Sequence, residues 1–248
     1  MELKEYQNKV IKVLTKYLSS LSDEKNKYVK LIEEHPDLSA DIDFSKKAWD
    51  SSINTLYTQH SNGLKEPLPD FYLKVPTGGG KTLLACHAID LVNKIYLKRQ
   101  TGLVLWVVPS TQIYRQTLTN LRNREHPYRQ VLDISSGGRT LIKEKTEVFN
   151  HLDVEENLLI LLLMLPSANR KDKETLKVFK DSGGFTDFFP PEDDYKNNKA
   201  LLEKVPNLDT FNDEGGIFSQ VVKTSLGNTL KVLHPLVIID EGHKAYSE

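Results

Sequence analysis

The sequence predicts an α/β fold with a parallel sheet, and two observations lead to this prediction. Helix-like stretches at 82–98 and 111–123 alternate with continuous apolar runs, which is typical of parallel strands covered on both faces. A glycine-rich segment directly follows the first apolar run, at the position where loops line the ligand crevice of such a sheet. The strand-like runs are residues 71–75, 102–109, 130–134, 157–165 and 234–240.

Two regions lie outside this alternation. Residues 3–21 place apolar side chains at helical spacing, which predicts an amphipathic helix, and the polar stretch 22–70 predicts one or two helices followed by a loop. Residues 166–230 carry many charges and two Gly-Gly pairs, which predicts an insertion, part helical and part mobile. We therefore expect an N-terminal helical segment, 1–70, and an α/β domain, 71–248.

Composition indicates an ordinary globular protein, and the net charge does not indicate a particular partner. The 33 Lys and Arg residues nearly balance 34 Asp and Glu residues, for a net charge of -1. A single cysteine, Cys86, excludes an internal disulfide framework. The N-terminus has no apolar signal core, and the apolar run 158–165 is too short to cross a bilayer as a helix. We expect a cytoplasmic protein that does not contact a membrane.

The stretch "FYLKVPTGGGKT", residues 71–82, has the features of a phosphate-binding loop. Glycines permit positive φ and let backbone N–H groups approach an anion, and the following helix adds its positive N-terminal end. Lys81 would reach the β- and γ-phosphate oxygens, and Thr82 would ligate Mg²⁺. Val75 stands where the strict pattern has its first glycine, and a glycine-rich turn with a solvated lysine is the alternative. The three glycines that would wrap the phosphate are Gly78, Gly79 and Gly80.

The stretch "LVIIDEGHK", residues 236–244, brings two carboxylates to the end of an apolar run. Asp240 would hold Mg²⁺, through water, because this ion gives up its hydration reluctantly. Glu241 would orient and deprotonate the attacking water. An acidic turn after a buried strand is the alternative interpretation.

Together, "PTGGGKT" and "DEGH" resemble motifs I and II of the superfamily-2 DEAD/DEAH-box ATPases. Residues 223–245 are similar to the approach to motif II in the Res subunits of type III restriction enzymes. The resemblance implies a three-layer RecA-like P-loop NTPase domain that binds ATP and Mg²⁺, with Thr77 part of the nucleotide site. It implies an ATP-driven translocase or helicase that acts in a restriction or phage-defence system.

The resemblance also assigns residues outside these two motifs. Gln7, which follows Tyr6, would read adenine, since its amide both donates and accepts; a solvated helix glutamine is the alternative. His243 would couple the nucleotide site to the nucleic acid, unless it is simply an exposed histidine. Residues 107–122 match motif Ia, with an ordinary helix cap as the alternative there. The implied nucleic-acid contacts are Ser110, Thr111, Arg115, Ser136 and Ser167.

The implied partners are a nucleic acid, DNA more than RNA, and a modification or specificity subunit. The second RecA-like lobe of the family, with its arginine finger, has no counterpart in these residues. We therefore expect the N-terminal lobe of a longer motor, with slow hydrolysis by itself, because an arginine finger supplies about 10³–10⁵ in rate. A nucleotide-gated switch that moves no strand and a small-molecule phosphotransferase are the other functions considered.

Overall fold

The computed structural model describes residues 2–35, 42–76, 78–164, 178, 180, 183–212 and 220–242. The chain forms two compact units, Met1–Arg99 and Gln100–Glu248. The first unit contains the N-terminal helices together with the glycine-rich loop and the helix that follows it.

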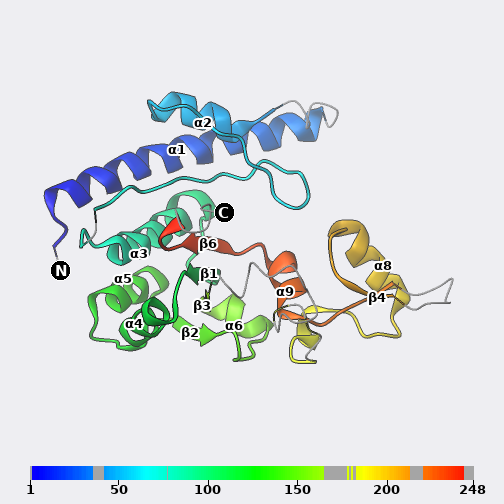
Figure 1. Cartoon of the computed structure of the whole chain (residues 1–248). Helices are drawn as coiled ribbons and strands as arrows, with labels where there is room; N and C mark the ends of the chain where they lie inside the picture. Colours follow the sequence, from blue (N-terminus) through cyan, green and yellow to red (C-terminus); the bar gives the residue numbers. More distant parts are fainter. Residues whose placement is uncertain are drawn as a thin grey trace. The chain divides into compact units, whose positions relative to one another are not determined.

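The first unit is built around one long helix, α1 (Glu5–Glu34), which packs against α2 (Phe44–Ser52) (Figure 1). No glycine or proline interrupts residues 5–34, so the predicted helix forms and continues beyond residue 21. Its buried stripe also packs against α3 (Lys81–Leu91) and the π-helix η2 (Val92–Leu97). The stripe consists of Leu14, Tyr17, Leu18 and Leu21.

The strand predicted at 71–75 is not present, because residues 71–76 have no regular secondary structure. Phe71 instead packs edge-on against Tyr17 of α1, with ring centroids 6.1 Å apart. Tyr72 is 60% exposed and Lys74 is also exposed. The side of the segment that carries these two residues therefore faces solvent, and only the opposite side packs against apolar groups. The aromatic run is therefore stabilised by helix packing within its own unit.

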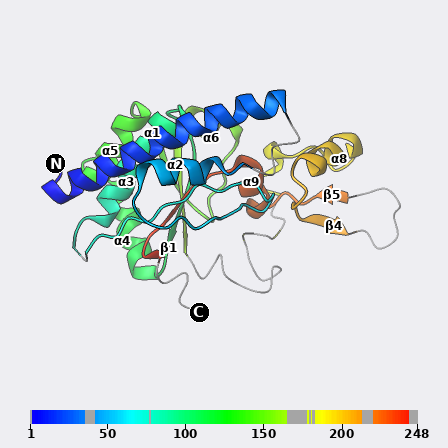
Figure 2. The same ribbon diagram turned by 90° about the horizontal axis from the view of Figure 1, so that it is seen from above.

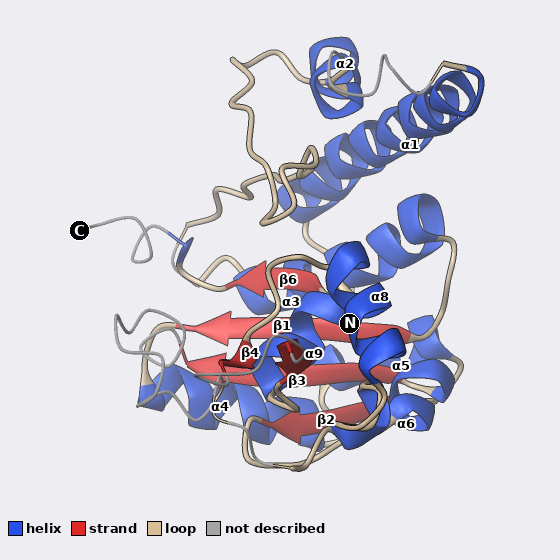
Figure 3. Cartoon of the chain, turned by 90° about the vertical axis from the view of Figure 1, so that its right-hand side faces the viewer, coloured by secondary structure: helices blue, strands red, loops and turns tan. Residues whose placement is uncertain are grey.

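The second unit contains a four-stranded parallel sheet in the order β2-β3-β1-β6 (Figure 3). Trp106 at its centre pairs with Leu162 on one side and Ile238 on the other. Helices α4 (Thr111–Arg122) and α5 (Pro127–Ser136) pack against this sheet. The predicted α/β class with a parallel sheet is confirmed. The strands are β1 (Gly102–Val108), β2 (Thr140–Glu144), β3 (Leu158–Met164) and β6 (Leu236–Ile239).

The strand predicted at 130–134 is wrong, since these residues lie within α5. Pro127 occupies the first turn, the His126 ring nitrogen accepts from Tyr128 N, and Gly137 ends the helix with φ 64°. These are helix start and stop signals. Ile134 is 78% exposed, so the apolar run has only one buried side. The edge strand of the sheet beside β3 is β2, a short strand that was not predicted from the sequence.

The predicted insertion is part helical in its described residues. Figure 2 shows α8, β4 and β5 grouped at one end of the second unit, away from α4. An aromatic cluster joins this region to the sheet: Phe149 meets Phe185 and Phe188 edge-on, in one core with Leu161 of β3. The remaining elements are α6 (His151–Glu156), η3 (Thr186–Phe188), α8 (Tyr195–Lys204), β4 (Thr210–Asn212), β5 (Gln220–Val222) and α9 (Leu226–Leu233).

None of the helices within the described part of the chain has the length and apolar character needed to cross a membrane.

Candidate nucleotide site

The glycine loop leads directly into α3 and has a backbone that only glycine adopts readily. Gly78 and Gly80 have φ values of 74° and 77°, in the left-handed region. Gly79 N donates to Pro76 O at 2.9 Å, and a Cβ at Gly79 would lie 2.5 Å from Val75 Cγ1. The tight turn therefore requires a residue without a side chain.

Gly80 is the N-cap of α3, and its carbonyl accepts from Leu84 N at 3.0 Å. Lys81 and Thr82 are consequently the first two residues of the helix, where backbone N–H groups have no partner within the helix. These groups, the helix dipole and the lysine charge all favour an anion at this end of α3. The geometry of the loop thus fits the predicted phosphate site.

Behind its first turn, α3 is anchored by buried side chains. Leu83, Leu84 and Ile89 are at most 2% exposed. Cys86 is fully buried, and this burial raises the pKa of its thiol, so the side chain is an un-ionised core residue. Burial also lowers the pKa of the neighbouring His87 imidazole. The helix that carries Lys81 is therefore held in an apolar setting.

The start of α1 contacts the glycine loop through two side chains. The Tyr6 hydroxyl donates to Gly79 O at 2.7 Å, and Gln7 Nε2 donates to the same oxygen at 3.0 Å. Gln7 Oε1 accepts from Lys4 N at 2.9 Å, so the Gln7 side chain satisfies the backbone N–H of the N-cap residue at the start of α1. Gln7 is 3% exposed, so it is not the solvated glutamine of the alternative interpretation. The contact between Tyr6 and Gly79 could not be predicted from the sequence, because the two residues are 73 positions apart.

In the second unit, Asp240 and Glu241 follow β6 directly. Asp240 N donates to Val107 O at 2.9 Å, so the acidic pair continues the pairing of β6 with β1 by one residue. Glu241 has a φ of 53°, which is uncommon for a residue with a Cβ. Such strain often marks a functional position. The pair therefore lies at the carboxyl edge of the parallel sheet.

The residues matched to motif Ia lie at the same edge. Ser110 is the N-cap of α4, and its hydroxyl accepts from Ile113 N at 3.4 Å. The Thr111 hydroxyl donates to Met164 Sδ, 3.6 Å away at the end of β3. Arg115 is exposed on the first turns of α4. Ser110 therefore has the capping role given above as the alternative, and contact with nucleic acid stays a prediction for all three residues.

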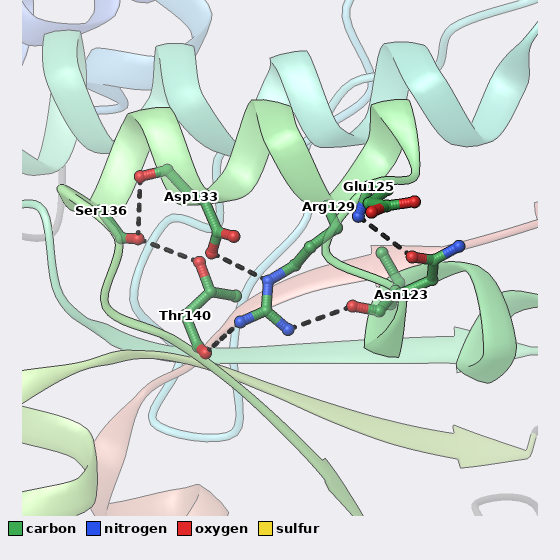
Figure 4. Close-up of polar contacts among 7 residues, drawn as sticks. Asn123, Glu125, Arg129, Asp133, Ser136 and Thr140 are labelled. Carbon is green, nitrogen blue, oxygen red and sulfur yellow. Dashed lines mark hydrogen bonds and ion pairs between the residues drawn. The ribbon is translucent and has the colours of Figure 1, made fainter.

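Ser136 has a different setting from the one predicted. It is fully buried at the end of α5, and its hydroxyl lies 2.9 Å from Thr140 Oγ1 (Figure 4). Arg129, also buried, donates to Asp133 Oδ1 at 2.8 Å and to Thr140 O at 2.7 Å. Figure 4 shows these contacts joining α5 to the start of β2. Since 134–139 is not a loop after a strand, we assign Ser136 a structural role.

Three predicted site residues, Thr77, Ser167 and His243, lie outside the described residues.

The four-stranded parallel sheet with its packed helices is consistent with the class of RecA-like domains. The model of one protein family, described as "Type III restriction enzyme, res subunit", matches residues 1–248. The chain therefore belongs to the family of type III restriction enzyme res subunits, whose members are ATP-dependent, helicase-type motors. A search of curated proteins and a search of solved structures found no match.

Proposed function

We propose that this chain binds Mg-ATP and is the ATP-binding motor lobe of a nucleic-acid translocase or helicase, acting in a restriction or phage-defence system. The observation that carries the proposal is the glycine loop, whose left-handed Gly78 and Gly80 lead to Lys81 and Thr82 at the first positions of α3. Family membership supports the same assignment.

Each residue of the nucleotide site has a distinct role in this proposal. The loop N–H groups and Lys81 bind the β- and γ-phosphates, and Gln7 reads adenine. Thr82 and Asp240 would hold Mg²⁺, which neutralises charge that develops on the phosphate oxygens. Glu241 orients the attacking water and accepts its proton. Thr77 and His243 are assigned to the nucleotide site by the motifs alone.

The nucleic-acid contacts are proposed at the carboxyl edge of the sheet. Thr111 and Arg115 at the start of α4 would donate to backbone phosphates, with Ser110 holding the helix in place. Ser167 is assigned there by its motif. We propose DNA as the preferred strand, a second RecA-like lobe as the source of an arginine finger, and a modification or specificity subunit as a further partner.

The test measures Mg-ATP binding by calorimetry and steady-state hydrolysis by residues 1–248, without nucleic acid and with single-stranded DNA, duplex DNA or RNA. We expect ATP binding, slow hydrolysis and a response to DNA. Lys81→Ala should abolish ATP binding, whereas Lys12→Ala, at an exposed lysine of α1, should leave it unchanged.

Three outcomes would contradict parts of the proposal. Failure of the parent chain to bind Mg-ATP would refute it entirely. Rapid, DNA-stimulated turnover by residues 1–248 would refute the dependence on a second lobe. Binding and hydrolysis that no nucleic acid alters would replace the motor with a nucleotide-gated switch.

A further inference from the structure

The carbonyl of Gly79 is the meeting point of α1 and the glycine loop. Two donors converge on this one oxygen, the Tyr6 hydroxyl at 2.7 Å and Gln7 Nε2 at 3.0 Å. A carbonyl oxygen has two lone pairs, so both are used. The Gln7 amide is itself oriented, because Lys4 N donates to its oxygen at 2.9 Å. The donors therefore approach from a helix start at which the Gln7 side chain also accepts from the N-cap N–H.

Holding this carbonyl also fixes the direction of the next N–H group. In a planar trans peptide, the C=O of one residue and the N–H of the next point to opposite sides. With the Gly79 oxygen directed at Tyr6 and Gln7, the N–H of Gly80 points away from the start of α1. The two donors thus set the orientation of one of the loop N–H groups proposed to bind phosphate.

The glycine loop itself only weakly restricts the orientation of the Gly79–Gly80 peptide. Gly78, Gly79 and Gly80 have no side chains, so their peptide planes rotate more freely than those of other residues. The contact with α1 is also close, because a Cβ at Gly80 would lie 2.6 Å from Gln7 Nε2. The bonds from Gly79 N to Pro76 O and from Leu84 N to Gly80 O hold the neighbouring peptides. The hydrogen bonds from Tyr6 and Gln7 hold the Gly79–Gly80 peptide between them.

We propose that Tyr6 and Gln7 act as positioning residues, a two-donor clamp that holds the Gly79–Gly80 peptide in the orientation that binds the triphosphate. This inference rests on the proposed function and adds to it a residue, Tyr6, and a role for Gln7 that does not depend on the base. The clamp makes the affinity of the loop for phosphate depend on the first turn of α1.

The test compares Mg-ATP with Mg-tripolyphosphate, which has the phosphates but no base, as ligands of residues 1–248. Tyr6→Phe removes one donor and keeps the ring, and should weaken both ligands by the same factor, about threefold to tenfold for one hydrogen bond. Gln7→Glu keeps an acceptor for Lys4 N but turns an oxygen toward Gly79 O, and should weaken both ligands further. The loss should be larger for Mg-ATP, because this variant also loses the proposed adenine contact. Tyr57→Phe is the matched control, because its hydroxyl donates to Asp43 Oδ2 at 3.0 Å, within the same unit but not to the loop.

Amide exchange of residues 78–84 in the nucleotide-free chain gives a readout that does not involve binding. Tyr6→Phe should raise exchange there and leave α9 unchanged. Equal affinity of Tyr6→Phe and the parent for both ligands would overturn the clamp, as would a loss confined to Mg-ATP or unchanged exchange. A parent chain that binds neither ligand would refute the proposed function, and the clamp with it. A parent chain that binds both ligands, with no effect of Tyr6→Phe, would refute the clamp alone.

Discussion

The backbone N–H of Asp240 donates a hydrogen bond to the carbonyl oxygen of Val107, 2.9 Å away. This bond places the acidic pair beside the end of β1, two residues before the Ser110 cap of α4. A change at the acidic pair therefore acts on backbone that leads directly into the proposed nucleic-acid contacts. If hydrolysis is coupled to strand binding as proposed, the route at this edge of the sheet consists of this one hydrogen bond and the chain from Val107 to Ser110.

We expect Glu241→Gln to preserve Mg-ATP binding and to remove residual hydrolysis. The amide keeps the size of the side chain but cannot accept a proton, and loss of a general base costs about 10²–10⁴ in rate. Single-turnover hydrolysis measures the change, and Glu192→Gln, at an exposed glutamate of the second unit, is the control. If Glu241→Gln hydrolyses ATP at the parent rate, Glu241 is not the base.

The positive φ of Glu241 leads to a separate prediction about stability. Glu241→Gly should be more stable than Glu241→Ala by about 1 kcal/mol, because a left-handed backbone costs roughly 1–2 kcal/mol for a residue with a Cβ and glycine lacks this cost. Urea unfolding of the two variants measures the difference, and both should lack hydrolysis. An alanine variant as stable as the glycine variant would show that residue 241 is not left-handed in solution.

The sequence predicted the fold class and the central strands because long apolar runs are strong signals. Leu158–Met164 and Gly102–Val108 are almost wholly buried, and their continuous apolar character needed no tertiary context. The runs at 71–75 and 130–134 were ambiguous because they are short. One packs on Tyr17 as a loop, and the other has the Pro127 and Gly137 signals of a helix.

The candidate site was predictable where the chemistry is local in the sequence. Gly78 to Thr82 form one short motif, as do Asp240 and Glu241. The positive φ of Gly78 and Gly80 was predicted, whereas the left-handed backbone of Glu241 was not. The clamp on Gly79 was not predictable, since it depends on how α1 packs beside the loop. Ser136 was misassigned because its buried hydrogen bond forms only when α5 meets β2.

The Arg129 contacts predict a large loss of stability. Arg129→Met should lower the free energy of unfolding by about 2–4 kcal/mol, because two buried carbonyl oxygens and the half-buried Asp133 carboxylate lose their charged donor. These are Leu121 O at 3.2 Å, Thr140 O at 2.7 Å and the Asp133 carboxylate. Arg124→Met, at an exposed arginine of the same unit, should change stability by less than about 0.5 kcal/mol. Urea unfolding of both variants checks the prediction, which equal stabilities would disprove.

Arg115 tests the proposed strand contact at the sheet edge. Arg115→Ala should weaken DNA binding by a similar factor across unrelated sequences, because a phosphate contact positions the strand without reading bases. It should also reduce the salt slope of log K by about 0.7 for single strands and about 0.9 for duplex. Fluorescence anisotropy over a salt series measures both quantities, with Lys199→Ala, at an exposed lysine of α8, as the control. If the salt slope of Arg115→Ala equals that of the parent, the strand does not contact Arg115. Binding without a phosphate contact releases fewer counterions and must lower the slope.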